Sequence, residues 1–145
     1  MKRIDYTIKD WTEYKLLDSG NSRKLESFGG IILDRPEPQA LWNKKKPDIW
    51  QNANAQFIWA DKGERWKITS DTKHDWTVRW NDLNIDLHLK DFKHIGVFPE
   101  HSILWDKIIS LGNKYKGLKM LNLFGYTGVD SMAAALSNME VTHVD

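Results

Sequence analysis

The chain has 145 residues, which fits one ordinary domain or two small ones, and its 21 basic residues are balanced by 20 acidic ones. The net charge of +1 excludes attraction of the whole chain to nucleic acid, and the absence of cysteine excludes disulfides and thiolate metal sites. No apolar run has the length of a signal-peptide core or a membrane helix, so we expect a cytoplasmic protein without a membrane partner.

Short alternating segments separated by turn residues fill residues 1–90 and predict a small β-rich domain. Residues 47–51 interrupt this pattern with one expected helical turn. The expected strands are residues 14–18, 24–28, 31–33, 55–59, 65–69, 76–80 and 83–89. The last two should pair as a hairpin, because only Asn81 and Asp82 separate them.

Tryptophan is the unusual component of this first part. Seven of the eight tryptophans stand here: Trp11, Trp42, Trp50, Trp59, Trp66, Trp76 and Trp80. Large aromatic side chains let a small domain build its core from few residues, and the spacing fits strands and turns. The other interpretation is base stacking in a nucleic-acid groove. We favour the core interpretation, since the spacing does not place these residues on one surface.

Two further features of residues 1–90 have an ordinary and a functional interpretation. Lys44, Lys45 and Lys46 form either a solvated loop, which is the commoner case, or contacts to nucleic-acid phosphates. His88 stands on the polar face of the last strand, where we expect it to be solvated or paired across strands. No second histidine or carboxylate stands beside it at metal-ligand spacing, so we expect no metal.

The periodicity changes after Lys90, and we place the boundary with a second domain, residues 91–145, at this point. Pro99 suits the first turn of a helix. That helix has an apolar stripe at Ile103, Leu104, Ile108, Ile109 and Leu111. The pattern then predicts a strand covered on both faces, a helix and a second strand, at residues 120–124, 130–136 and 141–145. This order is the start of a Rossmann-like α/β domain.

The turn between this strand and helix is bracketed by Gly125 and Gly128. Such a turn lets a ligand approach the backbone and presents N–H groups at a helix start. The three-glycine dinucleotide fingerprint and the phosphate-loop signature are both absent, which disfavours a pyrophosphate ligand and a nicotinamide-dependent oxidoreductase. Asp145, at the end of the next strand, can accept hydrogen bonds from both hydroxyls of a ribose. The pattern therefore favours an adenosyl ligand and leaves a plain packing turn as the alternative.

Residues 121–128, Leu-Asn-Leu-Phe-Gly-Tyr-Thr-Gly, closely resemble the leading S-adenosylmethionine motif of a family of class I methyltransferases. These enzymes are related to the ribosomal-RNA methyltransferases that modify cytosine C5 or guanine N7. Further stretches resemble the family's N-terminal hairpin, its next element, its pre-core segment and its second core strand. They are residues 14–20 with 24–29, 35–42, 92–100 and 141–145, in this order.

The resemblance implies S-adenosyl-L-methionine as the cofactor and RNA as the partner. The backbone of residues 124–128 would hold the amino-acid end of the cofactor, residues 98–101 would close over the methionine part, and Asp145 would hold the ribose. The implied cofactor-binding residues are Phe98, His101, Asn122, Phe124, Gly125, Tyr126, Thr127, Gly128 and Asp145.

The chain departs from the family pattern at several positions. His101 stands where the family usually has glutamine, and Leu104 where it has asparagine; a leucine cannot form hydrogen bonds. Asn138 and Met139 replace a Gly-Ala pair after the helix.

A complete domain of this class has a larger sheet and an Asp-Pro-Pro-type motif beside the target base, and neither is present. We therefore expect the N-terminal portion of such an enzyme, inactive or incomplete as this chain, with its catalytic residues unassigned. A non-catalytic RNA-binding module is the alternative.

Overall fold

The computed structural model describes residues 6–8, 11–59, 65–69 and 71–145. Two compact units are present. One comprises Trp11–Ile95, and the other comprises Gly96–Asp145 with the described part of the first ten residues. The sequence placed a boundary at residue 90, and that these units are separate domains stays a prediction.

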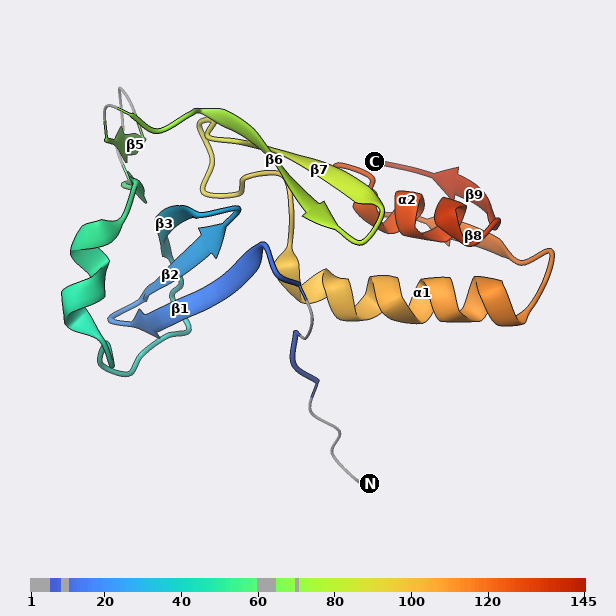
Figure 1. Ribbon diagram of the computed structural model, residues 1–145, viewed down its shortest axis with the longest axis horizontal. Helices are drawn as coiled ribbons and strands as arrows, with labels where there is room; N and C mark the ends of the chain where they lie inside the picture. The colour runs from blue at the N-terminus through green and yellow to red at the C-terminus, as the bar shows by residue number, and fades with distance from the viewer. Residues whose placement is uncertain (1–5, 9–10, 60–64, 70) are drawn as a thin grey trace. The chain divides into compact units, whose positions relative to one another are not determined.

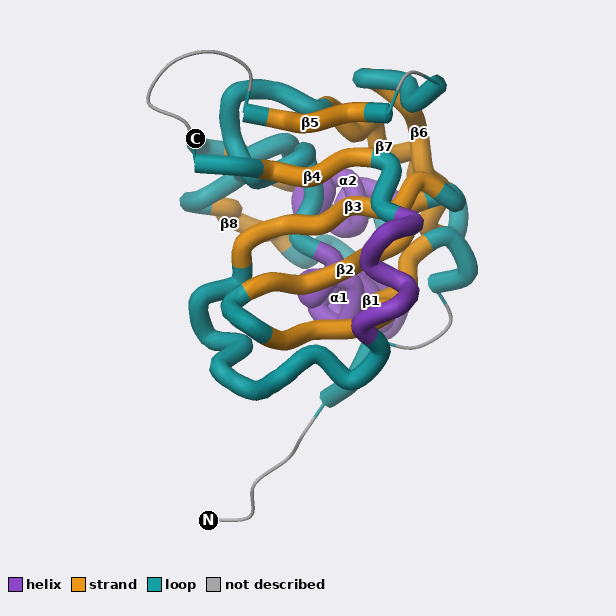
Figure 2. Tube along the Cα trace, turned by 90° about the vertical axis from the view of Figure 1, so that its left-hand side faces the viewer, coloured by secondary structure: helices purple, strands orange, loops and turns teal. Residues whose placement is uncertain are grey.

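A five-stranded sheet forms most of the first unit. Its strands are β1 (Tyr14–Gly20), β2 (Arg23–Phe28), β3 (Ile31–Pro36), β4 (Ala55–Phe57) and β5 (Trp66–Ile68). They lie in chain order, as Figure 2 shows, and all neighbours are antiparallel except β3 and β4. That parallel pair needs a crossover, and η1 (Pro47–Asn52), the expected helical turn, lies within it.

A buried ion pair crosses the centre of this sheet. The Arg35 guanidinium donates to Glu26 Oε2 from Nε at 2.9 Å and from Nη2 at 2.5 Å, and its Nη1 donates to the Lys93 carbonyl at 3.1 Å. The side chains of Glu26 and Arg35 are 1% and 5% exposed. Tyr14 also donates to Glu26, so this buried charge has several partners, as a desolvated carboxylate requires.

The hairpin of β6 (Asp75–Trp80) and β7 (Leu83–His88) confirms the expected pairing. Alternation along β7 buries Leu83, Ile85 and Leu87, as period-two spacing predicts. His88 faces Asp75 across the hairpin, with Nδ1 2.5 Å from Asp75 Oδ1. The interpretation of His88 as strand-paired is therefore confirmed.

Most tryptophans of this unit are core residues. Four of them are at most 8% exposed: Trp11, Trp50, Trp66 and Trp80. Indole N–H groups also donate hydrogen bonds within the protein, and that of Trp76, for example, donates to the Phe28 carbonyl at 3.1 Å. Trp42 and Trp59 differ, because they are 53% and 70% exposed. The core interpretation is thus right for the majority and wrong for these two.

The second unit contains a strand–helix–strand arrangement, drawn above a longer helix in Figure 1. Its elements are η2 (Pro99–His101), α1 (Ser102–Lys114), β8 (Lys119–Asn122), α2 (Val129–Leu136) and β9 (Glu140–His143). Strands β8 and β9 are parallel, with Met120 paired with Val141. Helix α1 packs on α2. A Cβ at Gly112 would overlap the Ser137 side chain, so glycine permits the close approach at this point.

The expectation that β8 is covered on both faces is wrong for the described residues. Asn122 is buried, whereas Leu121 and Leu123, on the opposite face, are 60% and 55% exposed. Helix α2 packs against β8 and β9 and covers one face only. In the part of the chain that the structure describes, no helix is long and apolar enough to cross a membrane.

Candidate functional site

A tight turn connects β8 to α2 and places two glycines where the backbone needs them. Gly128 has φ +89° and occupies the N-cap position of α2, in the left-handed region that favours glycine. Its N–H donates to the Gly125 carbonyl at 2.8 Å, which closes the turn. No side chain caps α2, so the first-turn N–H groups and the positive end of the helix dipole face this turn.

The second glycine permits contact with β9. A Cβ at Gly125 would overlap the imidazole ring of His143, so any other residue would displace that ring. The ring is held by Ser131, whose Oγ lies 2.9 Å from His143 Nδ1 and accepts the Asn122 side-chain amide at 3.0 Å. Asn122, Ser131 and His143 therefore fix the spacing of β8, α2 and β9 beneath the turn.

The end of β9 is tied to the same turn by three hydrogen bonds. Val144 donates to the Asn122 carbonyl at 2.8 Å, and Gly125 donates to the Val144 carbonyl at 2.9 Å. The Tyr126 N–H donates to Asp145 Oδ1 at 2.9 Å. Asp145 Oδ2 accepts no bond within the described ranges, so one oxygen of this carboxylate can still accept from a ligand.

A segment from before α1 closes the other side of the turn. Gly96 donates its N–H to the Tyr126 hydroxyl at 3.1 Å, and its carbonyl accepts from Thr127 Oγ1 at 2.6 Å. The Phe98 ring then lies 5.1 Å from the Tyr126 ring and 5.5 Å from the His101 ring, between centroids. The turn and residues 96–101 are thereby joined into one wall.

This wall bounds a cavity of about 40 Å³ that is partly open to solvent. Its lining combines aromatic rings with the backbone of the turn, from Val97, Phe98, His101, Trp105, Phe124, Gly125, Tyr126, Thr127, Val129 and Asp130. This volume is far below the range of about 300–1,000 Å³ that complete small-molecule sites have. The cavity therefore has room for only a small part of a ligand.

Six of the nine predicted cofactor-binding residues meet in this cavity: Phe98, His101, Phe124, Gly125, Tyr126 and Thr127. The other three lie next to the lining residues but are not part of the cavity wall. Asn122 is buried beneath the turn, Gly128 caps α2, and Asp145 bonds to Tyr126. Whether any of the nine binds a cofactor stays a prediction.

Sequence reasoning missed Asp130 and Trp105. Asp130, in the first turn of α2, accepts the Trp105 indole N–H on Oδ1 and lies 3.2 Å from His101 Nδ1 through Oδ2. An acidic residue in the first turn of a helix is ordinarily explained by its favourable interaction with the helix dipole. Its spacing in the sequence does not link it to Trp105 or His101, which stand 25 and 29 positions earlier. The cluster fixes the His101 ring at the cavity rim.

Of the family departures, Leu104 is 45% exposed and does not line the cavity. Asn138 has φ +61°, a conformation that glycine adopts freely and asparagine tolerates, so the replacement keeps the helix end. Among the described residues, no three His, Asp or Glu side chains are grouped to hold a metal ion.

No protein-family model matches the chain. A solved S-adenosylmethionine-dependent methyltransferase from Agrobacterium tumefaciens is 40% identical and superposes with a TM-score of 0.86 over 94% of this chain. The chain is related to the S-adenosylmethionine-dependent methyltransferases. The alignment spans 44% of the Agrobacterium methyltransferase, so the chain corresponds to less than half of that protein.

Other methyltransferases agree with this relationship. The ribosomal RNA large subunit methyltransferase K/L of Shewanella loihica is 47% identical over 60 residues, which are 41% of this chain and 8% of that protein. SMU.776, which was solved in complex with SAH, is 16% identical with a TM-score of 0.63 and shows likeness of fold alone. It is covered to 38% of its length, and this chain to 94%. The resemblance to class I methyltransferases related to ribosomal-RNA enzymes is therefore confirmed.

Proposed function

We propose that residues 96–145 form the wall of an S-adenosylmethionine site that holds the methionine and ribose parts of the cofactor. The observation that carries the proposal is the cavity at the β8–α2 turn, which residues 124–127 line beside the uncapped start of α2. The residues fit the cofactor: Phe98 and His101 would face its methionine part, N–H groups of the turn its carboxylate, and Asp145 Oδ2 its ribose.

The reaction supported best is methyl transfer to a base of RNA, and ribosomal RNA is the substrate class that the name of the Shewanella loihica relative suggests. When bound, S-adenosylmethionine supplies a methyl group on a positively charged sulfur, which a nucleophile can attack. Residues of this chain would orient the cofactor. Since the described cavity is small and partly open, we propose that the chain by itself is incomplete as a catalyst and binds the cofactor weakly.

The test is a titration of the full chain with S-adenosylhomocysteine, followed by amide chemical shifts. We expect shifts at Tyr126, Thr127 and Gly128 that saturate only at ligand concentrations above micromolar. Asp145→Ala should weaken binding, because it removes the acceptor proposed for the ribose. Glu140→Ala is the matched control, since it removes one carboxylate from the first residue of β9, whereas Asp145 follows the end of that strand.

Two results would contradict the proposal. Absence of shifts at the turn, or equal effects of Asp145→Ala and Glu140→Ala, would show that the cavity is no cofactor site. Micromolar affinity would refute the statement that the chain binds the cofactor weakly.

A second candidate function, RNA binding without catalysis, is favoured by one observation in the other unit. There an exposed tryptophan, Trp42, precedes the Lys44–Lys46 run with one residue between them. Loss of cofactor binding with retained RNA binding would favour this second function.

A further inference from the structure

Trp42 is an exposed tryptophan with a fixed orientation. Its Nε1–H donates to the Ser19 carbonyl at 2.9 Å and to Ser19 Oγ at 3.2 Å, while 53% of the residue remains exposed. The polar edge of the indole is therefore satisfied within the protein. The apolar ring stays in contact with water, which is an unfavourable position for so large an aromatic surface unless something covers it.

The backbone that supports Trp42 is held against the β1–β2 turn. Asn21 donates to the Trp42 carbonyl at 2.7 Å, and Ser22 donates to the Ala40 carbonyl at 2.8 Å. A Cβ at Gly20 would overlap the backbone N of Lys44, so the two segments touch main chain to main chain. The ring is thus presented by a rigid support, which lowers the entropy cost when a ligand stacks on it.

The next residues supply positive charge. Asp18 binds the backbone N–H groups of Lys45 and Lys46 at 3.3 and 2.9 Å and the Trp50 indole at 2.8 Å, so its buried carboxylate is fully engaged. The Lys44 ammonium lies 3.5 Å from the centre of the Trp50 ring.

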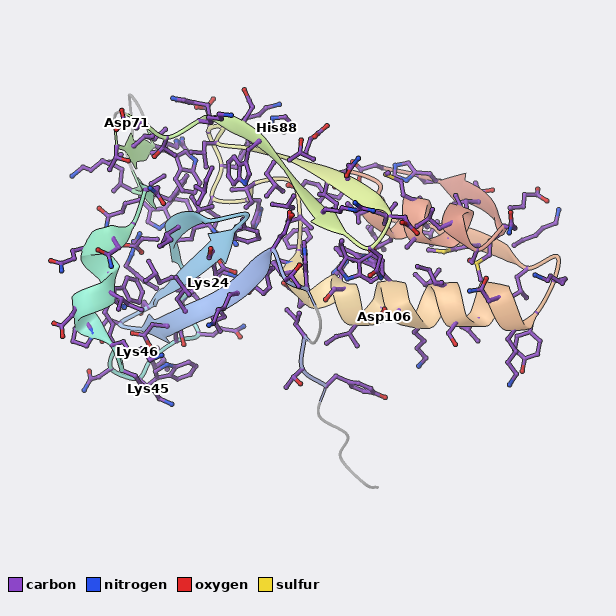
Figure 3. The ribbon with its side chains drawn as sticks, in the orientation of Figure 1. Lys24, Lys45, Lys46, Asp71, His88 and Asp106 are labelled. Carbon is purple, nitrogen blue, oxygen red and sulfur yellow. The ribbon has the colours of Figure 1, made fainter. Side chains whose placement is uncertain are left out.

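The side chains of Lys45 and Lys46 are exposed, and Figure 3 labels both beside the loop that precedes η1. Neither forms an ion pair with a described residue. Asp48 is the one exposed acid in η1, which leaves the loop with net positive charge.

We propose that Trp42, Lys45 and Lys46 form a platform that binds single-stranded RNA, with an unpaired base on the Trp42 ring and phosphates at the two lysines. Aromatic stacking combined with backbone neutralisation is how proteins bind single strands without reading sequence. A duplex would not fit, because its bases are stacked on one another and unavailable to the indole. The choice of RNA over DNA rests on the proposed function.

The test is fluorescence anisotropy of a labelled single-stranded RNA of about 12 nucleotides, within the site sizes of such proteins. The full chain is used at low salt and without cofactor. Trp42→Ala should weaken binding about tenfold, as removal of one stacking partner does. Trp42→Phe, which keeps an aromatic face, should retain most of the affinity. Trp59→Ala is the control, because Trp59 is even more exposed and stands 13 residues after Lys46 in the sequence.

The charge contribution is measured by salt dependence. Lys45→Ala with Lys46→Ala should reduce the slope of log affinity against log salt by about 1.4, because each phosphate that a lysine neutralises adds about 0.7 to the slope for a single strand. The control pair, Lys67→Ala with Lys73→Ala, removes the same charge from exposed positions of the same unit and should leave the slope unchanged.

Three results would overturn the proposal: equal effects of Trp42→Ala and Trp59→Ala on affinity, equal affinity for the same sequence as a duplex, or equal slopes for the two lysine pairs. If RNA binding is unchanged in Trp42→Ala, the exposed Trp42 ring would be explained as a contact for another protein instead. Since no cofactor is present, failure here leaves the cofactor titration unaffected, and failure of that titration leaves this result intact.

Discussion

At the scale of single residues, buried polar groups of the first unit such as the Asp18 carboxylate have hydrogen-bond partners within the protein. Asp18 is 7% exposed, and burial by itself raises the pKa of its carboxyl. Hydrogen bonds from the Trp50 indole and from backbone N–H groups, including those of Lys45 and Lys46, outweigh burial and lower the pKa below its ordinary value. The ionised form is therefore the one that the fold stabilises.

This lowered pKa predicts a pH-dependent contribution to stability. A depressed pKa means that the stabilisation is present above the unfolded value of about 3.9 and is lost as the pH falls through the folded value. Asp18→Asn should lower the free energy of unfolding by about 1.5–3 kcal/mol at neutral pH, as for hydrogen bonds to a charged group, and by less below about pH 4. Urea unfolding at both pH values measures this, with the exposed Asp71→Asn as control. A difference that does not change with pH would contradict the prediction.

At the scale of elements, the strand–helix–strand unit depends on how α2 begins and ends. Gly128 begins it in a left-handed conformation, and Asn138 follows its end in the same region, with φ +61°. Ser137 donates to the Ala134 carbonyl at 2.8 Å at this end. The glycine turn in the sequence identified Gly128 as the residue before α2. The sequence could not show that Asn138 adopts the positive φ of the glycine that the family has at this position.

Glycine should therefore be more favourable than asparagine at position 138. Asn138→Gly is expected to raise the free energy of unfolding by about 0.5–1 kcal/mol, because glycine adopts a positive φ without strain. Asn113→Gly, in the last turn of α1, should lower it by a similar amount, since glycine weakens a helix. Thermal denaturation of both variants distinguishes the helix-end effect from a general effect of glycine. A decrease in stability at position 138 would show that the asparagine side chain contributes there.

At the scale of the whole molecule, the two units differ in how fully their apolar surface is covered. The first unit buries Leu25, Phe28, Leu33 and Phe57 completely. In the second, β9 pairs with β8 alone among the described strands, and Leu121 is 60% exposed. Local opening should therefore require less free energy in the second unit.

Hydrogen exchange of the full chain tests this difference. Amides of β2 and β3 should be protected at least about tenfold more than those of β8 and β9, because little buried apolar surface holds a two-stranded parallel pair. Equal protection in both sheets would contradict the expectation.

Sequence patterns identified most of the elements because period-two spacing and turn residues are local signals, and β7 with its buried Leu83, Ile85 and Leu87 is an example. They also identified the residues of the β8–α2 turn. They missed the contact of Asp130 with Trp105 and His101, since it joins helices through side chains distant in the chain. The exposure of Trp42 was equally out of reach, because burial depends on what the fold places over a ring.

The distribution of tryptophan has a spectroscopic consequence. Trp105 is the one tryptophan in residues 96–145, and it lines the cavity with its indole N–H on the Asp130 carboxylate. Seven others stand in the remaining sequence. If every tryptophan carries a fluorinated indole, a Trp105→Phe variant assigns the Trp105 resonance, whose frequency follows the electric field of that carboxylate. The same nucleus would report on occupancy of the cavity independently of any event in the first unit.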